Sequence, residues 1–298
     1  MRVSRSIVSL VVLLLVACFQ TGCFLTYEKA TETRTYQVDM ASATAFEIAT
    51  TNGLVDLVVD PTLTTAEITA EVKATGATME EAESRLALIT VTIETTAEGV
   101  VVLGVDTADE RRSGDGCSFT IRTPAADAAT IVTRNGAVTV TGVTGPANLE
   151  TSNGVITVRD HAGAVRAETS NGRISISGKS IGEVFASSSN GAIEVVDAAG
   201  PVEARTSNGA IRCSLTDAAS GPVKARTSNG SVTLDLPVSI GGSLRADTSN
   251  GSVSVENGQS AAGLSASKKA ATIQLSDGEG GPESTINTSN GSIVIRLR

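Results

Sequence analysis

The chain has 298 residues, of which 41% are hydrophobic but only 2% aromatic, and its formal net charge is −9. A core without aromatic bulk has to be built from Val, Ile, Leu and Ala, which is unusual for a globular enzyme of this size. The negative charge argues against nucleic acid as a partner, because phosphate binding needs a basic face.

Residues 1–17 have the pattern of a signal peptide. Arg2 and Arg5 precede an apolar run that is too short to span a bilayer comfortably. The run ends in Leu15-Val16-Ala17-Cys18, which resembles the lipobox of bacterial lipoproteins. That resemblance implies cleavage before Cys18 and acylation of its sulfur and its new amino terminus, which would anchor the chain to a membrane.

Two alternatives to this anchor remain open. Cys23 is a second candidate for acylation, although Gln20 stands where the lipobox has an aliphatic residue. The other alternative is an ordinary secretory signal. If the anchor exists, we expect the protein in the cell envelope, at the outer membrane, in the periplasm or at the cell surface. Residues 18–35 are then predicted to be the anchor and a polar, extended tether.

Residues 36–130 are predicted to form an N-terminal capping region of mixed α/β structure. Phe46, Ile48, Asn52-Gly53, Val55 and Leu57 match one strand–corner–strand unit of the repeat described below. A capping box with Thr78 as N-cap and Glu81 predicts a short helix to about Leu88. Period-two alternation predicts strands at 66–74, 90–95, 99–105 and 117–123.

The most charged loop of the chain runs from Asp106 to Gly116. Its acidic residues could supply oxygen ligands to a cation, namely Asp106, Asp109, Glu110 and Asp115. Their spacing is not that of an EF-hand, and Arg111 and Arg112 offset the charge. A solvated hairpin loop is therefore favoured, and the sequence predicts neither a metal site nor a cofactor.

Residues 131–298 are organised around a repeated Asn-Gly pair. The pairs begin at Asn135, Asn153, Asn171, Asn190, Asn208, Asn229, Asn250 and Asn290. Most follow Thr-Ser, and most are 18–21 residues apart. The last interval is twice as long, and Ala270-Ala271 stands where a worn copy of the corner would fall. A fixed period near 20 residues is typical of a stacked repeat protein.

The residues on both sides of each Asn-Gly alternate between apolar and polar, which predicts two strands with one buried face. A chain of hairpins would use Asn-Gly in the same way. A hairpin makes no demand on the preceding Thr-Ser, whereas stacked coils place each side chain over its copy in the next coil. We therefore predict an all-β fold, a right-handed parallel β-helix with coils of about 18–21 residues, in which Ile174 pairs with Ile193 and Ile193 with Ile211.

The rest of the repeat offers few residues for chemistry. The outward positions of the first strands carry charges of both signs, and Phe185 is an aromatic candidate contact among them. His161 is predicted to be an exposed loop residue, so it does not predict a triad. Cys117 and Cys213 are interpreted as buried thiols that could be bridged only if their Cα atoms lie close enough. The end at Arg298 is predicted to be an exposed edge.

The lipobox, the early Thr-Asn-Gly unit, the Glu-rich helix and the repeated Thr-Ser-Asn-Gly units together resemble a bacterial putative-adhesin family of β-strand-repeat proteins of unknown function. The resemblance covers about residues 36–298. It implies a β-helix in the cell envelope, and it implies no catalytic residues.

The function expected from sequence is that of a non-enzymatic envelope protein with an adhesive or envelope-interaction role. Its expected partners are the membrane, through the lipid anchor, and an envelope protein or a surface glycan. A polysaccharide-active β-helix enzyme is one alternative, and it would need convergent carboxylates on neighbouring coils. An envelope stress or regulatory module is the other.

Overall fold

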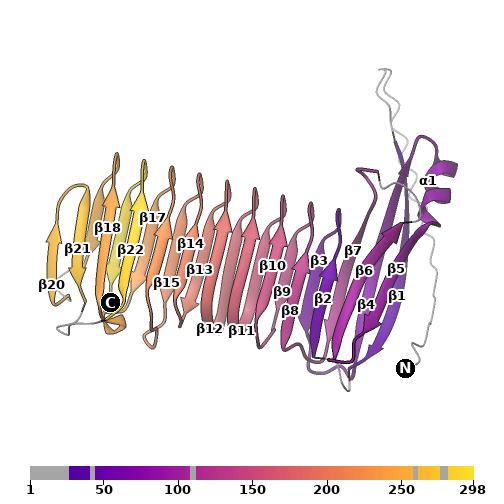
Figure 1. The fold of residues 1–298 in the computed structure, drawn as a ribbon, viewed down its shortest axis with the longest axis horizontal. Coiled ribbons are helices and arrows are strands. Elements are labelled where there is room, and N and C mark those ends of the chain that lie inside the picture. Colours follow the sequence, from indigo (N-terminus) through magenta and orange to yellow (C-terminus); the bar gives the residue numbers. More distant parts are fainter. Residues whose placement is uncertain (1–26, 41–43, 108–111, 258–260, 276–280) are drawn as a thin grey trace. The chain divides into compact units, whose positions relative to one another are not determined.

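The computed structural model describes residues 27–40, 44–107, 112–257, 261–275 and 281–298. Cys18 and Cys23, and with them the predicted signal peptide, lie outside these residues. The described chain is mostly β-strand with one short α-helix (Figure 1). It divides into two compact units, Met1–Ala137 and Val138–Arg298. None of the described helices is long and apolar enough to cross a bilayer.

The described residues of the first unit form eight strands and the helix. They are β1 (Glu28–Asp39), β2 (Ala45–Ala49), β3 (Val55–Val59), β4 (Thr65–Gly76), α1 (Met79–Leu86), β5 (Ile89–Thr95), β6 (Val100–Thr107), β7 (Gly116–Thr123) and β8 (Ala128–Val132). β2 pairs in parallel with β6 and β8, and β3 pairs in parallel with β7. β4 pairs antiparallel with β1 and β7, and β5 pairs antiparallel with β6.

The local predictions for this unit are largely confirmed. Phe46, Ile48, Val55 and Leu57 are buried on either side of Asn52, as expected for an early repeat unit. The Thr78 hydroxyl accepts a hydrogen bond from the Glu81 amide at 3.2 Å, so the N-cap is confirmed. The Glu81 carboxylate accepts from the amide of residue 77, which completes the cap one residue before the predicted partner.

The tether prediction for residues 18–35 is wrong in its second half. β1 begins at Glu28, and its whole length pairs with β4, from Glu28 opposite Gly76 to Asp39 opposite Thr65. Alternating Thr and Glu residues are polar, yet such a strand can form when its backbone groups are satisfied by a neighbour and its outer face is left to solvent.

The second unit is a stack of strands that are mostly parallel. Its elements are β9 (Val138–Thr141), β10 (Ala147–Thr151), β11 (Ile156–Thr169), β12 (Ile174–Ser188), β13 (Ile193–Ala198), β14 (Val202–Arg205), β15 (Ile211–Leu215), β16 (Val223–Arg226), β17 (Val232–Leu236), a 3₁₀ turn (Val238–Ile240), β18 (Ser243–Thr248), β19 (Val253–Glu256), β20 (Gly263–Ala266), β21 (Ala270–Gln274), β22 (Glu283–Thr288) and β23 (Ile293–Leu297). Each Asn-Gly corner joins two strands that belong to different columns of this stack (Figure 1).

The predicted register of the stack is confirmed. Ile174 pairs with Ile193, and Ile193 pairs with Ile211, all in parallel strands. The hairpin alternative is wrong, because β11 and β12 pair in parallel along both of their straight parts. A solenoid-like repeat explains this pattern, because each strand takes its partners from the neighbouring coils and not from its own coil.

The inward side chains of the stack are small and aliphatic. One column carries a buried alanine at the same position of five coils, namely Ala167, Ala186, Ala204, Ala225 and Ala246. Ile286 of β22 lies between the last two of them. Columns of Ile, Val and Leu face them from the second strands. Close packing of such small residues keeps the coil narrow, which is why a chain with almost no aromatic side chains can fill its core.

The last coil of the chain is not the last coil of the stack. β22 lies between β16 and β18, and β23 lies between β17 and β19. The prediction of an exposed edge at Arg298 is therefore wrong. Both strands of the final segment have a parallel neighbour on each side, so their backbone groups are satisfied.

The prediction of a worn coil at Ala270-Ala271 is also wrong. These residues begin β21, which pairs antiparallel with β20 and with β18. Antiparallel pairing needs only a short turn, and here the turn lies between Ala266 and Ala270. The hairpin β20–β21 thus covers the outer edge of β18, which would otherwise be unpaired.

Candidate functional site: the Asn corners and the groove beside them

The Asn residues of successive corners are joined by side-chain hydrogen bonds. Each amide nitrogen donates to the amide oxygen of the coil beneath it, at 2.7–2.8 Å from one corner to the next. In the order of the stack this ladder runs through Asn153, Asn171, Asn190, Asn208, Asn229, Asn290 and Asn250. In the first unit Asn135 makes the same bond to Asn52. The turn ladder expected from sequence is present as hydrogen bonds.

The residue two positions before each Asn of this ladder is buried and stabilises the corner by hydrogen bonds to its backbone. The Thr169 hydroxyl accepts a hydrogen bond from the Gly172 amide and donates one to the Gly154 carbonyl of the preceding coil, each at 3.1 Å. Ser188 makes the same two bonds in the next coil. Because these hydroxyls are buried, each satisfies a backbone donor and a backbone acceptor that water cannot reach. This is the physical reason for the repeated Thr.

The corner needs a glycine because there is no room for a side chain, and not because the backbone is left-handed. Asn and Gly both tolerate a positive φ, but neither Asn171 nor Gly172 has one. A Cβ atom on Gly172 would lie 1.6 Å from the carbonyl oxygen of Gly154. The corners stack so closely that no side chain fits at this position.

His161 is buried, and the prediction that it is exposed is wrong. Asp160 takes a left-handed conformation with a φ of 48°, after which His161 lies inside the stack with no exposed surface. Neither imidazole nitrogen makes a hydrogen bond. Burial lowers the pKa of His161, and the nearby backbone groups of Ala164 and Val143 oppose the shift only partly. An imidazole with no exposed surface has no route to a substrate.

The two described cysteines are free thiols with no exposed reactive group. Cys117 and Cys213 are both buried, as predicted. Burial raises the pKa of each thiol to about 12. The reactive thiolate is therefore negligible near neutral pH, and both residues act as small hydrophobic side chains.

The acidic loop contributes a structural ion pair. Asp115 is 2% exposed and accepts hydrogen bonds from the Thr75 amide at 2.9 Å, from the Arg85 guanidinium at 2.6 Å and from the Arg112 amide at 2.9 Å. Burial raises the pKa of Asp115, but these hydrogen bonds outweigh burial, so the net shift is downward. Asp109 and Glu110 lie outside the described residues, and the described residues hold no cluster that fits a metal ion.

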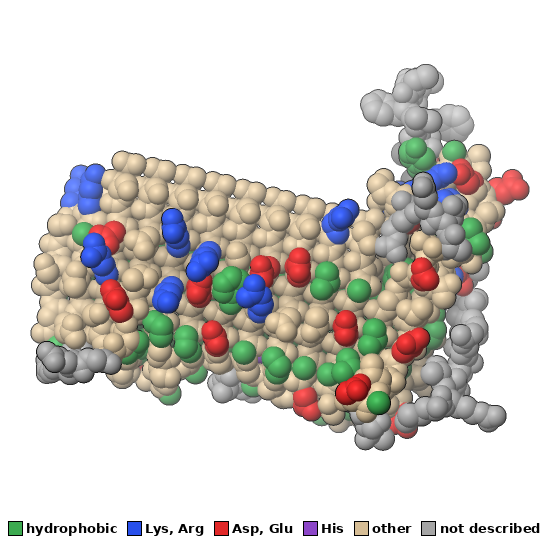
Figure 2. Space-filling view, in the orientation of Figure 1, with side chains coloured by type: hydrophobic (Ala, Val, Ile, Leu, Met, Phe, Trp, Pro, Cys, Tyr) green, Lys and Arg blue, Asp and Glu red, His purple; other side chains and the backbone are tan. Residues whose placement is uncertain are grey.

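The outward face of the first-strand column carries many of the surface charges of the repeat. Figure 2 shows a band of Lys, Arg, Asp and Glu side chains across the strands, with Lys and Arg more frequent over the C-terminal coils. Arg166 lies over the ring of Phe185 at 4.3 Å, so this aromatic candidate is partly covered by a cation.

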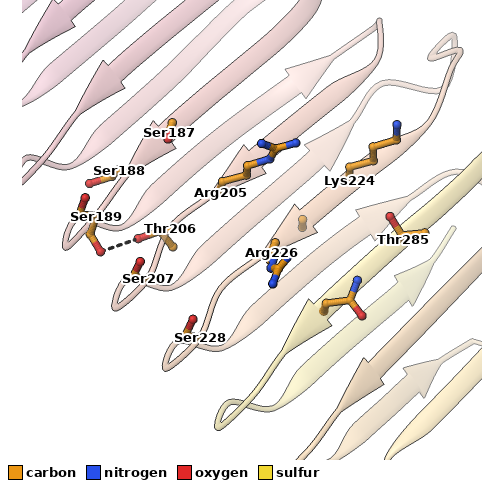
Figure 3. A pocket seen from close by; sticks show the side chains of 12 residues that line it. Ser187, Ser188, Ser189, Arg205, Thr206, Ser207, Lys224, Arg226, Ser228 and Thr285 are labelled. Carbon is orange, nitrogen blue, oxygen red and sulfur yellow. Dashed lines mark hydrogen bonds between the residues drawn. The ribbon is translucent and has the colours of Figure 1, made fainter.

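Beside this column lies a polar groove of about 650 Å³ (Figure 3). Its floor is formed by the outward side chains of β14, β16 and β22, among them Arg205, Lys224 and Arg226. Its wall is formed by the serines of the Thr-Ser-Asn-Gly corners, such as Ser207 and Ser228. A second groove shares Arg226, Ser228 and Asn287 with the first and continues across β22 and β18. In the sequence these charged residues are spread over separate repeats, and only the stacking brings them together.

A family model described as "Toastrack DUF4097" matches residues 45–296. No curated protein matches the chain significantly. A "putative adhesin" from Bacteroides fragilis NCTC 9343 is similar in structure, with 14% identity, coverage of 89% of this chain and 97% of that one, and a TM-score of 0.48.

Two further solved structures are similar. A "putative cell adhesion protein" from Clostridium sporogenes ATCC 15579 has 11% identity, coverage of 91% and 100%, and a TM-score of 0.23. A "putative adhesin" from Parabacteroides merdae ATCC 43184 has 12% identity, coverage of 89% and 96%, and a TM-score of 0.35. At such identities and TM-scores these structures add nothing to the functional argument.

Proposed function

We propose that this chain, which belongs to the Toastrack DUF4097 family, is a non-enzymatic, lipid-anchored protein of the bacterial cell envelope with an adhesive or envelope-interaction role. The observation that carries the proposal is the polar groove, which crosses several coils on one face and is lined by charged and hydroxyl side chains. A long, open, polar groove suits an extended partner better than a small substrate, which needs an enclosed and largely apolar pocket.

The proposed architecture of the repeat is a right-handed parallel β-helix with coils of about 18–21 residues. The parallel pairing of β11, β12, β13 and β15 supports it. Connections between parallel strands of one sheet are right-handed in nearly all proteins. A left-handed stack would contradict the proposal, and an experimental structure of the repeat would show the hand directly.

The proposed membrane anchor is acylated Cys18, with Cys23 as the alternative. The support is the Leu15-Val16-Ala17-Cys18 pattern after an apolar run. Cells expressing the protein should incorporate labelled fatty acid into it, and Cys18→Ala should remove the label. Loss of label in Cys23→Ala but not in Cys18→Ala would move the anchor to Cys23. Absence of label from the unchanged protein would leave a secreted protein without an anchor.

The proposed contact surface can be tested by crosslinking in intact cells. A photoreactive residue in place of Ser228, inside the groove, should capture a surface glycan or an envelope protein. The same residue in place of Arg159, which is exposed and outside the groove, is the matched control. Equal capture from both positions, or capture from neither, would contradict a role for the groove.

The captured partner and the activity of the purified protein distinguish the two alternative functions. A membrane signalling protein as the captured partner would favour a stress or regulatory module over adhesion. Polysaccharide cleavage by the purified protein, abolished by Glu203→Gln, would overturn the non-enzymatic assignment, because it would make this outward carboxylate catalytic. No cofactor and no nucleic acid are part of the proposal.

A further inference from the structure

On three of the first strands, β11, β14 and β18, the outward charged side chains occur in pairs of opposite sign. The two members are separated by two residues on one strand, and they form ion pairs between Arg166 and Glu168 on β11, between Glu203 and Arg205 on β14, and between Arg245 and Asp247 on β18. Alternate residues of a strand share a face, so each pair neutralises its own coil.

β16 breaks this pattern. Its two outward positions carry Lys224 and Arg226, which are both cations and both exposed. Across the described chain neither side chain forms an ion pair with a carboxylate. The coil that holds them therefore has two uncompensated positive charges in a protein whose net charge is −9.

The neighbouring coils add to the charge. Arg226 is the direct cross-strand partner of Arg205, and like charges in that position repel each other. Glu203 stands opposite Lys224, but its carboxylate is engaged by Arg205. On the other side, Thr285 and Asn287 are the neutral partners of Lys224 and Arg226. The arrangement costs stability unless an anion lies between the cations.

These cations lie in the groove, and the rest of its lining is hydroxyl-rich. Ser187, Ser207 and Ser228 face the same space as Lys224 and Arg226 (Figure 3). Ser249 and Ser289 continue the row in the adjoining groove. The lining contains no aromatic side chain on which a nucleic-acid base could stack, and its one apolar residue is Ala225. The surface therefore suits neither nucleic acid nor the acyl chain of a lipid.

We propose that the groove binds an acidic polysaccharide, whose anionic groups are held by Lys224 and Arg226 and whose hydroxyl groups bond to the serines of the corners. The proposal rests on the envelope-interaction role above and names its ligand class. Successive coils repeat about every 4.8 Å, so the serines and cations form a row that follows an extended glycan chain. Charge-assisted hydrogen bonds supply the affinity, and they weaken as salt rises.

The test is the binding of carboxymethyl dextran to the full chain in a mild nonionic detergent, with unmodified dextran as the neutral control. The variant Lys224→Gln/Arg226→Gln should bind carboxymethyl dextran at least about tenfold more weakly than the unchanged protein. The variant Arg159→Gln/Arg173→Gln loses the same charge from exposed positions outside the groove, and its affinity should stay within about twofold.

A second variant separates binding from folding. Arg226→Glu would give β16 an ion pair of the kind found on β11, β14 and β18, so it should be at least as stable as the unchanged protein and yet lose binding. Equal binding by the unchanged protein and Lys224→Gln/Arg226→Gln would overturn the proposal. Equal affinity for dextran, or for single-stranded DNA, would overturn the assignment to an acidic glycan.

The outcome is distinguishable from failure of the proposed function. Cells that still adhere through a protein unable to bind carboxymethyl dextran would overturn this inference and leave the adhesive role standing. If the protein binds carboxymethyl dextran but supports no adhesion and captures no partner in cells, the adhesive role is overturned and this inference stands.

Discussion

The side chain of Asn290 donates a hydrogen bond to Asn229 at 2.7 Å, although Asn250 lies between them in the chain. Asn250 in turn donates to Asn290 at 2.8 Å. The coil of Asn250 is therefore separated from that of Asn229 by one coil. The last strands of the chain, β22 and β23, occupy the position between them, after the hairpin β20–β21. The groove beside β16 depends on this order, because β22 supplies part of its floor.

Gly172→Ala should destabilise the protein by at least about 3 kcal/mol, because its Cβ would lie 1.6 Å from a carbonyl oxygen of the neighbouring corner. Gly263→Ala is the matched control, since the nearest atom to its Cβ would be 3.5 Å away. Urea unfolding measures both changes. Equal stability of the two variants would mean that the corners do not stack as closely as described.

Thr169→Val should cost roughly 2–4 kcal/mol, because it leaves the Gly172 amide and the Gly154 carbonyl without partners while it keeps the shape of the side chain. Thr169→Ser keeps both hydrogen bonds, as Ser188 does in the next coil, and should cost less than about 1 kcal/mol. If the Thr169→Val and Thr169→Ser variants unfold at the same urea concentration, the hydroxyl does not contribute to stability at this position.

Asp115→Asn should destabilise the first unit by about 3–5 kcal/mol, because Arg85 is only 13% exposed and would lose its ion pair with the buried Asp115 carboxylate. Arg122→Gln breaks the ion pair with Asp60, in which Arg122 is 53% exposed, and should cost less than about 1 kcal/mol. Comparable losses from the two changes would show that Asp115 is not buried in solution.

His161 makes stability depend on pH. Burial lowers its pKa in the folded protein, so the unfolded chain takes up a proton first as pH falls through about 6.5. The free energy of unfolding should therefore decrease as pH falls from 7.5 to 5.5, by up to about 1.4 kcal/mol per pH unit. His161→Leu should remove this dependence. A flat profile for the unchanged protein in that range would contradict the burial of His161.

Local structure was predictable wherever one residue pattern has one physical solution. Alternation predicted the strands around Ile174 and Ile193. The repeated Thr-Ser-Asn-Gly favoured stacked coils over hairpins, and in the structure each Asn side chain bonds to the Asn of the next coil, while Thr169 bonds to the Gly154 carbonyl of the preceding coil. Thr78 and Glu81 predicted the start of the helix, because a capping box involves only neighbouring residues.

The order of the coils was not predictable, because every corner carries the same residues and Asn290 fits beside Asn229 as well as Asn250 does. The burial of His161 depends on the left-handed turn at Asp160, which the sequence did not indicate. The groove could not be predicted either, because it depends on which coils are neighbours. Lys224 and Arg226 are visible as neighbours in the sequence, but their uncompensated charge appears only once Arg205, Thr285 and Asn287 are known to lie beside them.

The most direct test of the account is the order of the coils, measured by disulfide formation between engineered cysteines. Thr285 is the direct partner of both Lys224 and Arg245, so neighbouring Cα atoms lie about 4.8 Å apart, whereas Lys224 and Arg245 are two strands apart at roughly 10 Å. After mild oxidation and peptide mass spectrometry, Lys224→Cys/Thr285→Cys should crosslink and Lys224→Cys/Arg245→Cys should not, because a disulfide needs Cα atoms within about 7 Å. The opposite result would place the coils in the order of the sequence and would contradict both the inserted last coil and the groove that it completes.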